Sequence, residues 1–304
     1  MEVKEGMNGN KIFKGIFSAF FSVYDERMKV KSDTIHKLVE YQLEGGVQGF
    51  YVGGNTGECL VLPTQVRKKM LEAVIEANNG RGKIIVHVGA GHIEDVYELI
   101  DQANSLSVDA ISSLPPSLQG YYNTEEMLDY YRIIAQKSKV PVLSYITNVF
   151  NIDSVYFAKQ LMQIHNIIGL KMTRPDYYQF SKIAKVNNGN INILNGPDET
   201  MVCGLSVGAD GAIGTSYNIL PKVAVKIYNN FMQNNIFAAM KYQNQLNSVI
   251  DIVFGKNLAY WKAIMSIMGF DMGYTIEPQR IPDAKEYREL EQRLKDIDFE
   301  QLIA

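Results

Sequence analysis

The sequence has little cysteine and no long hydrophobic run, and these absences exclude several classes of protein. Of the 304 residues, only Cys59 and Cys203 are cysteines, and they form neither a CxxC motif nor a metal-ligand spacing. Two such cysteines favour a reduced, cytoplasmic setting over a disulfide-stabilised secreted one. No apolar run approaches the ~20 residues that a membrane-spanning helix needs. The first 14 residues are polar and charged, which is unlike a signal peptide.

Charge of one sign and nucleotide-binding motifs are also missing. The formal net charge is only −3, which gives no reason to expect nucleic acid or a membrane as partner. The four histidines form no ligand cluster, so we expect no metal: His36, His87, His92 and His165. Neither a Walker motif nor a dinucleotide fingerprint occurs. The sequence therefore favours a soluble globular protein with no metal site and no recognisable nucleotide-binding motif.

Short apolar runs alternate with amphipathic segments along most of the chain. We expect strands at 15–21, 48–52, 84–88, 109–114, 140–146, 167–172, 191–194 and 211–214. We expect helices at 33–44, 63–77, 93–103, 125–136, 154–164, 177–184, 199–207 and 221–232. The first of these helices would be capped by Ser32 or Asp33.

This alternation predicts an α/β fold made of parallel strand–helix units. Eight units within residues 15–232 favour a closed (β/α)8 TIM barrel, with a doubly wound open sheet as the alternative. We expect residues 1–234 to form the barrel as the catalytic domain. Residues 235–304 would form a C-terminal helical extension packed on the barrel or on a neighbouring subunit. Its helices are expected at 238–253, 258–268 and 287–302.

The sixth expected strand carries a lysine near its C-terminal end, Lys171. A charged ammonium inside a core is costly unless it is paired or loses its proton. A buried amine is more readily neutral, and a neutral amine is a nucleophile. The alternative is that Lys171 has reached the end of the strand and points to solvent. In a barrel of this type the reactive groups lie at the C-terminal ends of the strands, which favours the first interpretation.

Two other strand ends carry groups that can bind or transfer protons. The second strand ends in Gly53-Gly54-Asn55-Thr56, whose amides and side chains could hold a carboxylate, although a simple tight turn would look the same. The fifth ends near Tyr145, which shares a face with Leu143. An inward Tyr145 can pass a proton to a reacting atom, whereas the alternative is a core aromatic whose hydroxyl reaches water.

The seventh and eighth strands also end in polar sequence. The seventh is followed by Gly196-Pro197-Asp198-Glu199. The two carboxylates could accept hydrogen bonds from sugar hydroxyls or could equally cap the next helix. The eighth strand leads into Thr215, in another polar turn at the same end of the barrel.

Four stretches together resemble a known family. They are Tyr51 to Glu58 (YVGGNTGE), Tyr145, Gly169-Leu170-Lys171, and Gly208 to Thr215 (GADGAIGT). In order and spacing the chain resembles the pyruvate-dependent class I aldolases, typified by N-acetylneuraminate lyase and dihydrodipicolinate synthase. The resemblance implies that Lys171 forms a Schiff base with a 2-oxo acid and that Tyr145 relays protons. It also implies that Asn55 and Thr56 bind the carboxylate.

Within this family the chain is most similar to the N-acetylneuraminate lyase branch. The Tyr-Val-Gly-Gly opening and Asn-Gly-x-Asp-Glu, here residues 195–199, are typical of that branch. The resemblance implies that the sugar's hydroxyl tail is held by Thr173, Gly196, Asp198, Glu199 and Thr215. Dihydrodipicolinate synthases usually carry an arginine shortly after the tyrosine, and residues 146–151 contain none.

Three stretches depart from the branch's usual pattern. Asn55 stands where a serine of the proton relay is usual. The loop at Ile146-Thr147-Asn148 lacks the usual Tyr-x-Ile-Pro sequence and is about two residues shorter. The stretch Ser117-Leu118-Gln119-Gly120 replaces part of Pro-Phe-Tyr-Tyr, so the tyrosine that crosses to a neighbouring subunit would be absent or supplied by Tyr121.

The expected activity is cleavage of N-acetylneuraminate to pyruvate and N-acetylmannosamine, through a covalent Schiff base at Lys171 and without a cofactor. One alternative is a class I aldolase or dehydratase that acts on another 2-keto-3-deoxy sugar acid. A second is a non-catalytic homologue that only binds pyruvate or a sugar acid. The partners would be the small-molecule sugar acid and pyruvate, and the resemblance implies a homotetramer.

Overall fold

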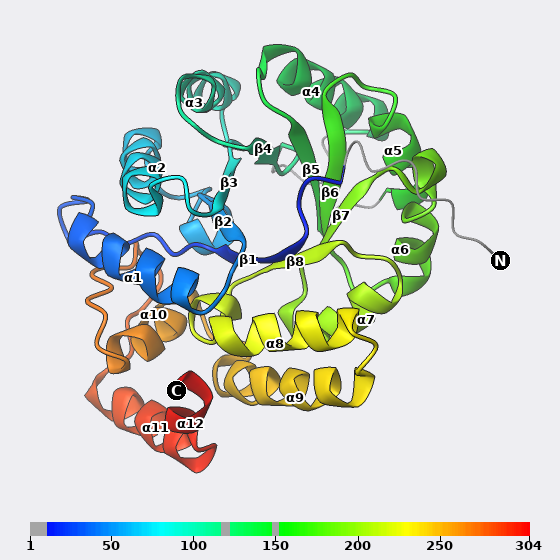
Figure 1. Ribbon diagram of the computed structural model, residues 1–304. Coiled ribbons are helices and arrows are strands. Elements are labelled where there is room, and N and C mark those ends of the chain that lie inside the picture. Colours follow the sequence, from blue (N-terminus) through cyan, green and yellow to red (C-terminus); the bar gives the residue numbers. More distant parts are fainter. Residues whose placement is uncertain (1–10, 117–121, 148–151) are drawn as a thin grey trace.

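The chain forms a closed barrel of eight parallel strands with helices around it (Figure 1). The computed structural model describes residues 11–116, 122–147 and 152–304. Each strand pairs with the next along the chain, and β8 pairs with β1. The strands are β1 (Gly15–Ala19), β2 (Gly49–Val52), β3 (Lys83–His87), β4 (Ala110–Ser113), β5 (Val142–Thr147), β6 (Ile167–Thr173), β7 (Asn192–Asn195) and β8 (Gly211–Gly214).

The connecting helices cover the outside of the barrel, as the TIM-barrel prediction requires. They are α1 (Ser32–Glu44), α2 (Thr64–Asn78), α3 (Ile93–Ser105), α4 (Thr124–Lys137), α5 (Ser154–Leu161), α6 (Tyr177–Ile183), α7 (Met201–Ser206) and α8 (Pro221–Met232). Short 3₁₀ turns lie between several elements: η1 (Asn55–Gly57), η2 (Val186–Gly189), η3 (Asp198–Thr200) and η4 (Ser216–Asn218). The predicted closed barrel is confirmed, and the open-sheet alternative is wrong.

Two apolar cores follow from the alternation of side chains along each strand. One fills the barrel interior and includes Phe17, Ile85, Leu143, Leu194 and Ile213. The other lies between the strands and the surrounding helices. Tyr145 belongs to the interior core together with Leu143, as predicted from their shared face.

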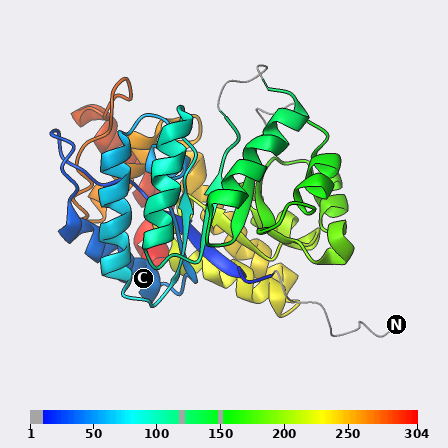
Figure 2. The same cartoon turned by 90° about the horizontal axis from the view of Figure 1, so that it is seen from above.

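The C-terminal extension consists of α9 (Ile236–Val253), α10 (Leu258–Ile267), α11 (Ala284–Asp296) and α12 (Phe299–Ile303). Helix α9 lies beside α8, whereas α10 to α12 lie on the side of the barrel where α1 is found (Figure 1). Figure 2 shows the same arrangement from above, with the orange and red helices α10 to α12 on the side away from the green helices α4 and α5. Among the described residues no helix is long and apolar enough to cross a membrane.

Three details of the expected elements are wrong. Helix α1 starts after Lys31 and has no side-chain cap, so neither Ser32 nor Asp33 caps it. The expected helix at 287–302 is two helices, because Asp298 adopts a left-handed conformation with φ of 53° between α11 and α12. The helix expected at 199–207 begins at Met201, after the 3₁₀ turn η3.

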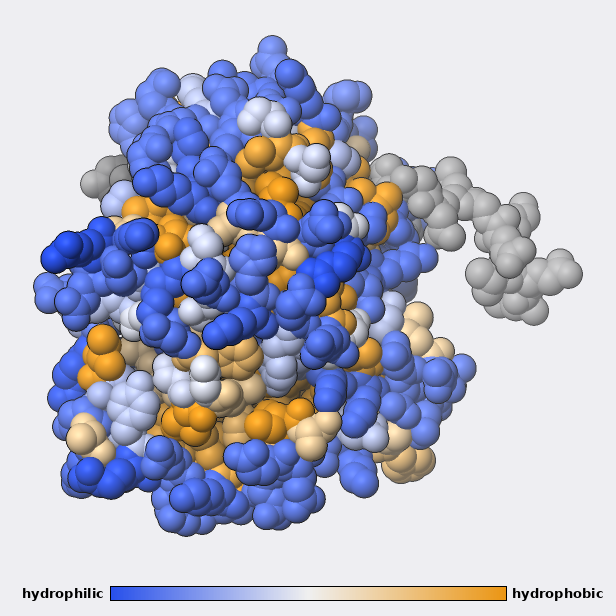
Figure 3. All heavy atoms as spheres, turned by 60° about the vertical axis from the view of Figure 1, so that its left-hand side comes forward, coloured by the Kyte–Doolittle hydropathy of each residue, from blue (hydrophilic) through white to orange (hydrophobic). Residues whose placement is uncertain are grey.

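The surface on the left-hand side of Figure 1, over α1 and α2, is mostly hydrophilic (Figure 3). Its hydrophobic side chains form separate small patches among polar ones. Scattered apolar residues of this kind are normal on a folded protein and do not by themselves mark a binding face.

Candidate active site

Lys171 lies inside the mouth of the barrel, near the C-terminal end of β6. Its side chain does not point to solvent, because the residue is only 6% exposed. In the sheet it stands beside Tyr145 of β5 and Leu194 of β7. Its Nζ lies 4.5 Å from the ring centroid of Tyr145 and 4.8 Å from that of Tyr51. The amine is therefore enclosed by two aromatic rings, at distances typical of cation–π contacts.

None of the ion pairs among the described residues includes Lys171. A salt bridge would hold the amine in its protonated form and occupy the electron pair that a nucleophile needs. The geometry therefore suits an amine that condenses with a carbonyl group.

Tyr145 stands between Lys171 and the polar residues farther out. Thr173, two residues beyond Lys171 on β6, donates a hydrogen bond from Oγ1 to the Tyr145 hydroxyl oxygen over 3.4 Å. The backbone of Tyr145 is fixed from behind, because its N–H donates to the hydroxyl of buried Tyr131 over 3.2 Å. A phenol with a defined position and a neighbouring hydroxyl is suited to proton transfer.

Tyr51 and His87 were not predicted to take part in the site, although the rings of both lie 6.3 Å from the ring of Tyr145. The Tyr51 hydroxyl donates to Ser112 Oγ over 3.1 Å, and burial raises the pKa of Tyr51 well above its ordinary value. His87 accepts from the Leu114 N–H over 3.0 Å, and burial lowers its pKa well below the usual range. Both side chains are therefore neutral near pH 7. Their inward positions at the ends of β2 and β3 were readable from strand alternation.

The turn after β2 contains η1 and brings Thr56 to the barrel mouth. The Thr56 hydroxyl contacts the Thr215 hydroxyl at 2.7 Å, which joins the turns after β2 and β8. Gly54 packs so closely on the ring of Tyr51 that a Cβ there would collide with it. The exposed side chain of Asn55 accepts a hydrogen bond from Cys59 Sγ over 3.4 Å. Thr56 therefore faces the other polar turns, whereas the Asn55 amide is engaged within its own turn.

A cavity of about 290 Å³ brings the other predicted residues together. Its lining includes all five residues predicted for the hydroxyl tail: Thr173, Gly196, Asp198, Glu199 and Thr215. Gly196 is required at its position, because a Cβ would collide with Thr173 Oγ1. The cavity thus includes Thr173, the hydrogen-bond partner of Tyr145, whereas Lys171 and Tyr145 are not part of its lining.

Two further residues of this cavity, Ile250 of α9 and Trp261 of α10, come from the C-terminal extension. Sequence reasoning missed them, because only the folded chain shows that these helices reach the barrel mouth. They add apolar surface to a cavity whose lining also carries carboxylates and hydroxyls.

Asp198 does not cap the helix that follows it. Helix α7 has no side-chain cap, and the Asp198 carboxylate instead accepts hydrogen bonds from the Ser216 N–H and hydroxyl at 2.7 and 2.6 Å. Loss of solvent raises the pKa of Asp198 to about 6, although the bonds from Ser216 and the charge of Lys171 act in the opposite direction. The capping alternative is wrong for Asp198, and its carboxylate titrates close to neutral pH.

Several positions that depart from the family pattern lie outside the described residues. These are the stretch Ser117 to Gly120, Tyr121 and Asn148. Tyr122, the next residue, is 42% exposed. Among the described residues no group of three or more His, Cys, Asp or Glu side chains could hold a metal ion.

Comparisons with known proteins agree with this arrangement. The sequence profile described as "Dihydrodipicolinate synthetase family" matches residues 12–297. N-acetylneuraminate lyase 2 of Escherichia coli O6:H1 is 31% identical over 262 residues, which cover 84% of this chain and 85% of the relative.

Solved structures give the same result. N-acetylneuraminate lyase of Proteus mirabilis superposes with a TM-score of 0.89 at 26% identity, covering 94% of this chain and 99% of that one. The N-acetylneuraminate lyase of Mycoplasma synoviae does so with a TM-score of 0.85 at 30% identity, covering 94% and 98%. The profile match over nearly the whole chain, together with the barrel, assigns this protein to the dihydrodipicolinate synthetase family, whose members are lyases of the class I aldolase type.

Proposed function

We propose that this protein cleaves N-acetylneuraminate to pyruvate and N-acetylmannosamine through a Schiff base on Lys171. The observation that carries the proposal is the position of the Lys171 amine. It is buried at the mouth of the barrel between the rings of Tyr51 and Tyr145, beside a polar cavity. The named relatives, which are N-acetylneuraminate lyases, support the choice of substrate.

The chemistry divides one difficult bond cleavage into easier steps. Lys171 Nζ attacks the 2-oxo carbon of the open-chain sugar acid, and loss of water gives a protonated imine. This imine withdraws electrons, so the bond between C3 and C4 breaks. Tyr145 takes the proton of the C4 hydroxyl or relays it, with Thr173 as its neighbour. The enamine that remains takes a proton back at C3, from Tyr145 or through its relay, to give the pyruvate imine. Hydrolysis of this imine releases pyruvate and returns the free amine.

The two ends of the substrate would be held by different turns. The backbone amides of the glycine turn, the Thr56 hydroxyl and the NH2 of Asn55, whose Oδ1 already accepts from Cys59, would donate hydrogen bonds to the carboxylate beside the imine. The hydroxyl tail would lie in the cavity that Thr173, Gly196, Asp198, Glu199 and Thr215 line. Carboxylates accept hydrogen bonds from sugar hydroxyls more strongly than neutral groups do.

Two features also fit a second class of substrate. The Asp198–Glu199 pair suits any polyol tail, and Asn55 replaces the serine usual in the lyase branch. The alternative is therefore an aldolase or dehydratase for another 2-keto-3-deoxy sugar acid.

A panel of sugar acids distinguishes these substrates by the rate of pyruvate release. We expect kcat/KM to be highest for N-acetylneuraminate and at least about tenfold lower for acids that lack the acetamido group. A clear preference for another sugar acid would replace the proposed substrate but keep the mechanism. Imine formation without turnover on any acid in the panel would instead favour the non-catalytic homologue.

The proposal includes no external cofactor, since the covalent imine supplies the electron sink. It also includes assembly as a homotetramer in the cytoplasm, as in the family that the chain resembles. Light scattering after size-exclusion chromatography should give four times the chain mass of 34.3 kDa. A species of one chain mass that turns over sugar acid at the full rate would contradict the tetramer.

A further inference from the structure

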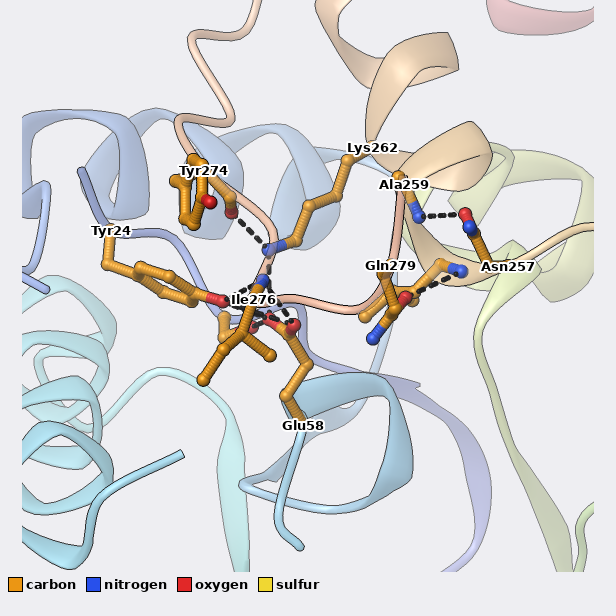
Figure 4. A network of polar contacts seen from close by, with 10 residues as sticks. Tyr24, Glu58, Asn257, Ala259, Lys262, Tyr274, Ile276 and Gln279 are labelled. Carbon is orange, nitrogen blue, oxygen red and sulfur yellow. Dashed lines mark hydrogen bonds and ion pairs between the residues drawn. The ribbon is translucent and has the colours of Figure 1, made fainter. Parts of the chain in front are cut away.

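A buried ion pair connects the C-terminal extension to the glycine turn. Lys262 of α10 lies 2.9 Å from Glu58 Oε2, and their side chains are only 3% and 1% exposed. Glu58 directly follows η1, the 3₁₀ turn that contains Asn55 and Thr56. Figure 4 shows Lys262 reaching Glu58 from α10, with Tyr24, Tyr274 and Ile276 around them.

The carboxylate of Glu58 is surrounded by donors from three parts of the chain. Ser22 and Tyr24, which follow β1, both donate hydroxyl hydrogen bonds to it; the Tyr24 bonds measure 3.0 and 3.1 Å. The Ile276 N–H donates to it over 3.4 Å. Lys262 also donates to the Tyr274 carbonyl over 2.9 Å and lies over the Tyr24 ring. Ser22, Tyr24, Lys262 and Ile276 all donate to this one carboxylate, which restricts the movement of Glu58.

Fold stability alone does not explain this arrangement. Removing two charges from water costs several kcal/mol per ion, and apolar side chains of similar size often stabilise a fold equally well. Burial indeed lowers the pKa of Lys262, against the opposing attraction of Glu58. The ion pair fixes the position of one carboxylate, and with it the backbone at Glu58. An apolar contact would not do this.

That backbone belongs to the turn after β2, which the Thr56–Thr215 contact ties to the turn after β8. The Glu58 N–H donates to the Asn55 carbonyl over 2.9 Å, and Glu58 itself adopts a left-handed conformation with φ of 57°. Two residues earlier, Thr56 contacts Thr215, which lines the cavity. A shift of the Glu58 side chain would therefore move Thr56 and the amides beside it.

We propose that the Glu58–Lys262 pair is a positioning pair, through which the C-terminal extension holds the glycine turn in the shape that binds the substrate's carboxylate. This inference rests on the proposed function, because it assigns carboxylate binding to that turn. It gives the extension a part in the reaction beyond packing on the barrel.

The test uses a double variant that removes both charges and keeps the side-chain sizes, Glu58→Gln with Lys262→Met. Single substitutions would leave one charge buried without its partner and could unfold the protein. The full-length enzyme is incubated with pyruvate and sodium borohydride, and adduct formation is followed by mass spectrometry over a range of pyruvate concentrations. We expect the half-saturating pyruvate concentration to rise about tenfold, with a smaller change in the maximal trapping rate.

The matched control makes the same two changes in a remote pair, Glu98→Gln with Lys68→Met. That pair joins α3 to α2 at 2.8 Å and is partly exposed. We expect this control variant to keep the half-saturating pyruvate concentration of the wild type. Tyr24→Phe provides a milder variant, which removes one donor to Glu58 and leaves the ion pair. We expect its half-saturating pyruvate concentration to rise about threefold.

The outcomes separate this inference from the proposed function. A wild-type enzyme that forms no adduct would overturn both. Wild-type half-saturation in the Glu58–Lys262 variant and in Tyr24→Phe, with lower melting temperatures, would show that the pair holds the fold only. An equal rise in the Lys68–Glu98 control would also overturn the inference. If the double variant does not fold, the half-saturating pyruvate concentration of Tyr24→Phe decides, and a wild-type value there overturns the inference.

Discussion

At the scale of single residues, the site is a lysine that aromatic rings separate from water. The rings of Tyr51 and Tyr145 lie against its amine, and His87 packs 6.3 Å from the Tyr145 ring. Because His87 is neutral, it adds no charge beside the amine. The charged groups lie farther along the cavity, at Asp198 and Glu199. The groups proposed for imine chemistry and those proposed for sugar recognition thus lie in separate parts of the site.

The Tyr145 hydroxyl can be removed without disturbing the ring that packs on Lys171. Tyr145→Phe should lower kcat for sugar-acid cleavage by about 10²–10⁴-fold, because proton transfer at the C4 hydroxyl is lost. Borohydride trapping of pyruvate at Lys171 should persist. Tyr51→Phe, which removes the hydroxyl bonded to Ser112, should have a smaller effect on kcat. Undiminished turnover in Tyr145→Phe would remove this tyrosine from the proton-transfer step.

Asp198 should give substrate binding a pH dependence. Its pKa is raised to about 6, so the carboxylate is ionised above that pH and gains a proton below it. The ionised form accepts hydrogen bonds from sugar hydroxyls more strongly, so KM for the sugar acid should rise as the pH falls from 7 to 5. In Asp198→Asn this rise should disappear, with a KM at pH 7 about tenfold above wild type. A KM profile with the same inflection in the Asn variant would assign the titration to another group.

At the scale of elements, α10 contributes to the site through two consecutive residues. Trp261 lines the cavity, and Lys262 pairs with Glu58 behind the glycine turn. The indole and Ile250 add apolar surface to the cavity that we propose for the aldehyde half of the substrate. A short helix from outside the barrel thereby contacts the regions proposed for both halves of the substrate.

Trp261 is the single tryptophan of the chain, so its fluorescence reports on this cavity alone. Adding N-acetylmannosamine should change the emission in a saturable way, whereas pyruvate alone should change it less. Trp261→Phe should abolish the signal and raise KM for the sugar acid more than the half-saturating pyruvate concentration. An emission unaffected by saturating N-acetylmannosamine would place the aldehyde half elsewhere.

At the scale of the whole molecule, the barrel was predictable because its signals are local. Each strand is a short apolar run, and alternation alone places Leu143 and Tyr145 on one face of β5. The position of Lys171 and the grouping of Thr173, Gly196, Asp198, Glu199 and Thr215 follow once the strands close into a ring.

The parts that sequence reasoning missed depend on long-range contacts or on single backbone angles. Nothing near Trp261 or Lys262 in the sequence indicates that α10 reaches the barrel mouth. The break at Asp298 depends on one left-handed residue within a continuous helical pattern. The lack of a side-chain cap on α1 likewise reflects the course of the chain before Ser32, where Lys31 donates its N–H to the Val23 carbonyl.

The central claim, that Lys171 is the nucleophile, is tested most directly by trapping the imine. The enzyme is treated with pyruvate and sodium borohydride, its intact mass is measured, and the modified peptide is sequenced. We predict one reduced three-carbon adduct per chain, located at Lys171 and absent from Lys171→Met. An unmodified mass, or an adduct at another lysine, would contradict the account.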